Sequence, residues 1–120
     1  DIAEVISAIG NHDEHTGSTV TPITAALILA DKSDVRRSRV RTSSTVATDI
    51  HDRVNYAVYT SSLTIGPQKG ELILSLKIDT AISAVMDYFE IFLTRMMMCR
   101  KAAEFLKLNF QLQINDTRLL

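Results

Sequence analysis

Apolar residues in the first forty positions recur every three or four residues, which is the spacing of one helix face. In the first segment these residues are Ile2, Val5, Ile6 and Ile9. In the second segment they are Ile23, Ala26, Leu27 and Ala30. Thr21 suits the N-cap of the second helix, and Pro22 suits its first turn, where the missing N–H costs no hydrogen bond. We therefore predict two helices joined by a polar loop, the second ending near Asp34 or one turn later.

The pattern changes to strand-like alternation in the second half of the chain. "VNYAVYTSSLTI" is rich in β-branched and aromatic residues, "ELILSLKI" alternates strictly, and "GPQKG" between them predicts a hairpin loop. A long helix is expected from about Thr80 to Lys107, and "NFQLQIN" then alternates again. The predicted order is β-β-α-β, a small sheet with one long helix on its face. If the last strand is parallel to the second, the crossover should be right-handed.

These elements predict an α+β fold in two parts. Residues 1–41 form the helical part, residues 42–49 a small polar loop, and residues 50–120 the β-β-α-β unit. The chain opens directly in an amphipathic helical pattern with no lead-in segment. We therefore expect that an N-terminal portion precedes it.

The predicted long helix carries a wide apolar stripe. Steps of three and four residues make a heptad-like seam of Ile82, Val85, Phe89, Phe92, Met96, Cys99, Ala103 and Leu106. Three further apolar residues widen it: Met86, Leu93 and Met97. One helix on one sheet needs a single stripe, so the extra width indicates a second contact. That contact is either with the chain's own helical half or with a second copy, and we predict a homo-oligomer, a two-fold homodimer.

Composition narrows the class of protein. A hydrophobic content of 46% is enough to build a core, and a formal net charge of -1 gives no overall attraction to nucleic acid. Charges interrupt every apolar run before the roughly 20 residues that a membrane span needs. The single cysteine, Cys99, cannot form an internal disulfide. We therefore predict a cytoplasmic protein that neither enters a membrane nor binds nucleic acid.

Candidate metal ligands lie around the second helix. His12 and His15 stand three residues apart, and on a continuing helix they would share a face, a spacing compatible with metal binding. Asp31 interrupts an apolar run, where a buried carboxylate costs several kcal/mol unless it is paired or bound to a metal. Lys32 is one available partner, and a metal ion is the alternative.

A basic cluster follows directly: Lys32, Arg36, Arg37, Arg39 and Arg41. Guanidinium groups form forked hydrogen bonds to phosphate oxygens, so a helix end carrying several of them would bind a nucleotide-like substrate. The arginines could equally pair with Asp34, Asp49 and Asp52, and cations are favoured at a helix C-terminus in any case. Both interpretations remain open.

Part of this pattern resembles a known family. "HDEHTG" followed by "TPITAALILADKSD" is similar to the later part of the HD-domain metal-dependent phosphohydrolases, in which a His-bearing helix and loop precede a helix whose aspartate closes the metal site. The resemblance covers about the first forty residues. It implies that Asp31 is a metal ligand, that His12 matches the family's additional histidine, and that His15 is a further candidate.

The resemblance also implies a cofactor and a reaction. The cofactor would be a divalent ion, with manganese, magnesium, iron and zinc all open, and the substrate a phosphate ester such as a nucleotide. The phosphate of that small molecule would be held by Lys32, Arg36, Arg37 and Arg39.

The chain also departs from the family pattern. The family's first histidine and its His-Asp doublet lie on earlier helices, and nothing before His12 supplies them. The doublet His51-Asp52 follows Asp31 and is expected to precede a strand, so its order and context are wrong for the family's doublet. We therefore predict part of a metal-dependent phosphohydrolase. The alternative is a non-catalytic oligomerisation or interaction module.

Overall fold

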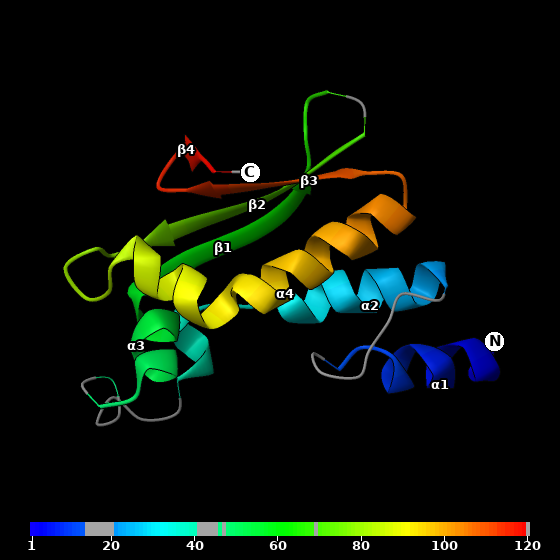
Figure 1. The fold of residues 1–120 in the computed structure, drawn as a ribbon, viewed down its shortest axis with the longest axis horizontal. Helices are drawn as coiled ribbons and strands as arrows, with labels where there is room; N and C mark the ends of the chain where they lie inside the picture. The colour runs from blue at the N-terminus through cyan, green and yellow to red at the C-terminus, as the bar shows by residue number, and fades with distance from the viewer. Residues whose placement is uncertain (14–20, 41–45, 47, 69, 120) are drawn as a thin grey trace.

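The computed structural model describes the whole chain except residues 14–20, 41–45, 47, 69 and 120 (Figure 1). Four α-helices, one short 3-10 helix and four strands follow one another in the described ranges. Their order is α1 (Ile2–Gly10), α2 (Pro22–Lys32), η1 (Arg37–Arg39), α3 (Ile50–Ala57), β1 (Val58–Ile65), β2 (Glu71–Ile78), α4 (Val85–Phe105), β3 (Asn109–Ile114) and β4 (Thr117–Arg118). The predicted α+β class is confirmed, and the β-β-α-β order is present in β1, β2, α4 and β3.

The start of α2 agrees with the sequence pattern. The Thr21 side chain accepts a hydrogen bond from the Thr24 backbone N–H at 3.1 Å, and Pro22 occupies the first turn. The helix ends at Lys32, earlier than the predicted Asp34. The chain then turns and places Val35 in the core with 0% exposure. Burial of this one apolar side chain favours the turn over another helical step.

Residues 50–57 form a helix, so the prediction that "VNYA" begins a strand is wrong for these four residues. Asp49 caps α3 by accepting hydrogen bonds from the backbone N–H groups of His51 and Asp52, at 2.8 and 3.4 Å. Val54 and Ala57, three residues apart on the helix, face the core. The cap and the helical spacing outweigh the β propensity of the residue types, and β1 begins only at Val58.

The sheet has the strand order β1-β2-β3-β4. β1 and β2 are antiparallel and joined by the predicted hairpin loop, in which Gly70 adopts a φ of 82°. β2 and β3 are parallel, and α4 forms the connection between them. The two-residue strand β4, which the sequence did not predict, pairs antiparallel with β3. The alternating apolar residues of β2 are buried on one face: Leu72, Leu74, Leu76 and Ile78.

Helix α4 lies between the sheet and α2 (Figure 1). It is shorter than the predicted helix and buries much of the predicted seam in the core, including Phe92, Met96, Cys99 and Ala103. One core contains residues of α2, α3, α4 and the sheet. The long helix therefore makes its second contact with the chain's own helical half.

Apolar side chains also remain on the surface. On α1 these are Ile2, Val5, Ile6 and Ile9, and on α4 they are Met86, Leu93 and Met97. Among the described residues, no helix has the length and apolar character needed to cross a bilayer.

Candidate functional site

Asp31 lies in the last turn of α2 and is paired with its neighbour. Its Oδ2 atom is 2.8 Å from the Nζ atom of Lys32. The Lys32 side chain is 8% exposed, and the Asp31 side chain is 41% exposed. The pairing considered from the sequence is therefore present. It leaves Oδ1 of Asp31 without a hydrogen-bond partner among the described residues.

The electrostatic surroundings keep this carboxyl group ionised. Burial by itself would raise the pKa of Asp31, but the hydrogen bond and charge of Lys32 oppose it, with smaller contributions from the charges of His12 and Arg95. The net effect holds the pKa below its ordinary value of 3.8. Asp31 is thus a carboxylate at neutral pH, which is the form that binds a cation.

His12 follows the end of α1 and is oriented by the helix. Its Nδ1 atom contacts the carbonyl oxygen of Ile9. A carbonyl only accepts hydrogen bonds, so the proton of a neutral ring lies on Nδ1 and the lone pair lies on Nε2. Packing of α1 on α2 brings this ring close enough to Asp31 that the imidazolium form would lower the pKa of that carboxyl group. The other predicted histidine ligand, His15, lies outside the described residues.

Asp31 and His12 carry the donor atoms that a metal ion could use. Asp31 offers a carboxylate oxygen and His12 an imidazole nitrogen, both of which bind zinc, manganese or iron. Within the described ranges, no three His, Cys, Asp or Glu side chains are grouped so that they could hold a metal ion. A hydrolytic zinc site commonly has three protein ligands. Among the described residues, the candidate donors near Asp31 are therefore this carboxylate and the His12 imidazole.

The structure separates the members of the basic cluster. Lys32 is buried beside Asp31, whereas Asp34 pairs with Arg36 Nε through Oδ1 and with Arg39 Nη1 through Oδ2, both at 2.9 Å. The pairing of the arginines with Asp34, one of the two interpretations from the sequence, is thus observed.

Arg37 is held differently. Its Nε–H donates to the carbonyl oxygen of Tyr56 at 2.8 Å, and its guanidinium carbon lies 4.3 Å from the centroid of the Tyr56 ring. Arg41 lies outside the described residues. No single surface therefore gathers all the described cations of the cluster.

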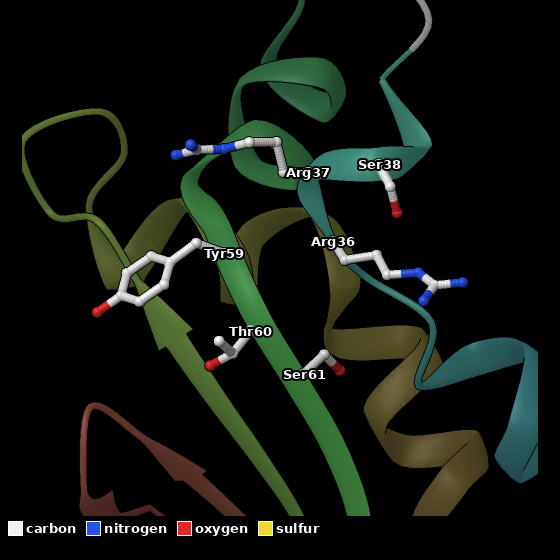
Figure 2. Close-up of a pocket in the computed structure, with 6 residues that line it drawn as sticks. All are labelled: Arg36, Arg37, Ser38, Tyr59, Thr60 and Ser61. Atoms are coloured by element: carbon white, nitrogen blue, oxygen red, sulfur yellow. The ribbon is translucent and has the colours of Figure 1, made fainter.

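Two of the arginines line a hollow beside the sheet. The hollow has a volume of about 580 Å³ and is bounded by Arg36, Arg37, Ser38, Tyr59, Thr60 and Ser61. Figure 2 shows the guanidinium group of Arg37 directed toward the side on which Tyr59 lies, and that of Arg36 directed the opposite way. The two groups are therefore not aimed at a single phosphate.

Arg95 is a site residue that sequence reasoning missed. It projects from α4, its guanidinium carbon lies 4.9 Å from the centroid of the Phe92 ring, and its charge helps to lower the pKa of Asp31. Arg95 lies far from Asp31 in the sequence, and packing of α4 on α2 brings the two residues near each other. The one signal in the sequence was an isolated arginine within the apolar run "IFLTRMMMC".

The second His-Asp doublet lies elsewhere. His51 and Asp52 are in the first turn of α3, where the backbone N–H groups of both are bound by the Asp49 cap. The His51 side chain is 67% exposed. Neither residue is among the groups that shift the pKa of Asp31.

Comparison of the chain with protein-family models, with curated proteins and with solved structures gives no match.

Proposed function

We propose that this chain supplies part of the metal site of an HD-type phosphohydrolase, with Asp31 and His12 as ligands to a divalent ion. One observation carries the proposal. Packing of α1 on α2 places an imidazole whose Nε2 lone pair is available near an ionised carboxylate whose Oδ1 atom is unpaired. The remaining ligands would come from His15 or from groups outside this chain.

The surrounding residues suit a phosphate ester as substrate. Asp31 and His12 would hold a divalent ion, which when bound would polarise a phosphoryl oxygen and make a bound water more acidic. Lys32 keeps Asp31 ionised, and the charge of Arg95 beside it favours a bound phosphate dianion. The proposed substrate class is a phosphorylated small molecule.

A site-specific binding experiment tests the ligands. Manganese is paramagnetic and broadens amide NMR signals near its binding site, so a titration with Mn²⁺ alone should broaden signals around Asp31 and His12 saturably. We expect weak binding because two protein ligands hold an ion poorly. Asp31→Asn should abolish the effect.

The matched control is Asp34→Asn. Asp34 lies three residues further along but pairs with Arg36 and Arg39, so its loss should leave the broadening around Asp31 unchanged. Equal loss of broadening in both variants would indicate nonspecific attraction of a cation to carboxylates, and the proposal would be wrong.

An activity measurement tests completeness. With manganese and p-nitrophenyl phosphate, the chain alone should hydrolyse the ester feebly or not at all, and a longer chain that includes upstream helices should gain activity. Robust turnover by the chain alone that Asp31→Ala abolishes would show that the site is already complete. If the longer chain binds no metal and gains no activity, the interaction module becomes the better hypothesis.

The second candidate function, an oligomerisation module, rests on the outer face of α4. Phe92 and Met96 of the predicted seam are buried in the chain's own core, but Met86, Leu93 and Met97 are 74%, 51% and 43% exposed. A small apolar cavity of about 50 Å³ is lined by Phe89, Leu93, Met96, Met97 and Arg100. A second copy of the chain packed on this stripe would bury it.

Charge substitutions on α4 test this candidate. Leu93→Glu should abolish a homodimer in size exclusion coupled to light scattering at high micromolar concentration. Thr94→Glu is the matched control, because Thr94 is an exposed neighbour outside the apolar stripe. Phe92→Glu would be uninformative because Phe92 is 1% exposed and its replacement would unfold the monomer. A compact monomer of the unmodified chain would rule out the homodimer.

Cys99 bears on the proposed cytoplasmic location. It is a buried free thiol and the chain's one cysteine, a usage that suits a reducing compartment. Immunodetection of the native protein in cell fractions tests the location, and recovery outside the cytoplasm would contradict it.

A further inference from the structure

β1 is an edge strand with a free side. It lies at one end of the strand order and pairs only with β2. Within the described part of the chain, no other backbone hydrogen bond involves residues 59–65. Alternate N–H and C=O groups along this edge therefore point away from the sheet, as they do in any strand with one neighbour.

The edge has few of the features that block strand pairing. Lysines, prolines and inward-pointing charges protect most natural sheet edges, but residues 54–66 contain neither a charge nor a proline. The irregularity present is a shift in register between Val58 and Thr60, at the start of the strand. The stretch from Thr60 to Ile65 is regular and able to accept a further strand.

Two cations flank the start of this edge. Arg36 and Arg37 line the hollow beside Tyr59, Thr60 and Ser61, and their guanidinium groups diverge (Figure 2). The Nε atom of each arginine already has a partner within the chain. That of Arg36 pairs with the Asp34 carboxylate, and that of Arg37 donates to the Tyr56 carbonyl oxygen. The terminal nitrogens of both side chains have no hydrogen-bond partner among the described residues.

We propose that the free edge of β1, together with Arg36 and Arg37, docks an extended acidic segment of a partner protein. The backbone of that segment would pair with Thr60–Ile65 as an added strand. Consecutive side chains of a strand point to opposite faces, so two adjacent acidic residues would meet the two diverging guanidinium groups, one on each side.

The charges distinguish this occupant from two others. If β1 paired with β1 of a second copy, that strand and its flanking residues would lie beside the arginines. Residues 54–68 contain no Asp or Glu, so the second copy would bring no carboxylate there. A small phosphate compound would engage both arginines only if they converged, and they diverge. This inference is independent of the proposed metal site.

Fluorescence anisotropy with a labelled peptide tests the proposal. The probe is an eight-residue peptide of valine and threonine with a central Glu-Glu pair, and it should bind saturably, whereas the Lys-Lys version should not. Methylation of alternate backbone nitrogens should abolish binding, because it removes the donors that an added strand needs without changing charge. Amide NMR shifts should be concentrated in β1.

Matched variants test the arginines. Arg36→Ala should weaken binding by about three- to tenfold, the effect of losing one partly exposed charge pair. Arg39→Ala removes the other ion pair to Asp34 but does not line the hollow, so it should change the affinity less than twofold.

Several results would overturn the proposal. These are no saturable binding at millimolar peptide, equal binding of the methylated peptide, or equal weakening by Arg36→Ala and Arg39→Ala. Displacement of the peptide by sodium pyrophosphate at constant ionic strength would assign the arginines to a small anion instead. Self-association of the chain that the peptide reverses would assign the edge to a second copy.

Discussion

Lys32 and Asp31, neighbours at the end of α2, form a 2.8 Å ion pair in which the cation is almost entirely buried and the anion is half exposed. Adjacent residues on a helix do not face each other, so the lysine must bend its chain along the interior to reach the carboxylate. Asp31 therefore compensates a buried charge in the core through Oδ2.

This pair predicts an asymmetric response to mutation. Asp31→Ala should lower the free energy of unfolding by roughly 1–2 kcal/mol, because it leaves the Lys32 ammonium buried without its partner. Lys32→Met keeps the apolar stem and removes the charge, so it should be neutral or stabilising. Urea denaturation measures both. If Asp31→Ala lowers the free energy of unfolding by the same amount in the Lys32→Met variant as in the unmodified chain, loss of the ion pair is not the cause.

The same carboxyl group predicts a pH dependence. The pKa of Asp31 is lowered in the folded state, so as the pH falls through 3.8 the unfolded chain takes up this proton first. The stability that Asp31 contributes is therefore complete above that pH and lost as the pH falls through the folded-state pKa. The difference in unfolding free energy between the unmodified chain and Asp31→Asn should narrow on acidification. If this difference in unfolding free energy stayed constant as the pH fell, the predicted contribution of Asp31 would be wrong.

Cys99 should be inert in the folded protein. Burial is the main cause that raises the pKa of its thiol to about 12, against smaller lowering effects of Lys32 and Arg95. The ordinary value is 9.0, so burial leaves about a thousandfold less thiolate at neutral pH. Reaction with a disulfide reagent at pH 8 should be slow until guanidinium unfolds the chain. Fast labelling of the folded protein would contradict the burial of this residue.

Asn115 should be a stability determinant just beyond β3. Its side chain accepts a hydrogen bond from the Ile78 N–H at 2.8 Å and donates one to the Ile78 carbonyl at 3.0 Å, which extends the contact with β2. Its φ is 51°, a left-handed conformation.

Substitutions at Asn115 separate the two contributions. Asn115→Ala should cost roughly 2–3 kcal/mol, because both hydrogen bonds are lost and alanine is strained at this φ. Asn115→Gly loses the hydrogen bonds but adopts this φ without strain. It should therefore lower the free energy of unfolding by about 1 kcal/mol less than Asn115→Ala does. Thermal unfolding measures both, and equal costs would show that the backbone conformation contributes nothing.

Much of the secondary structure was determined by local sequence. Thr21 and Pro22 define the start of α2 because a cap and a preset φ act within one turn. The alternation of β2 specifies its buried face, because successive side chains of a strand point to opposite sides. The α+β class follows from these local periods. The strand prediction for "VNYA" is wrong because the Asp49 cap and the helical spacing outweigh the β preference of these residue types.

Tertiary packing decided the rest, above all at the candidate sites. Packing of α4 on α2 brings Arg95 near Asp31 and buries Lys32, and packing of α1 on α2 brings His12 near the same carboxylate. The spacing of charges along the chain predicts one basic cluster, yet its members separate because Val35 turns the chain into the core between them. Contacts between residues distant in sequence depend on which apolar faces are buried against each other. The sequence by itself therefore determines which ionisable side chains are available, and packing of the core determines which of them come into contact.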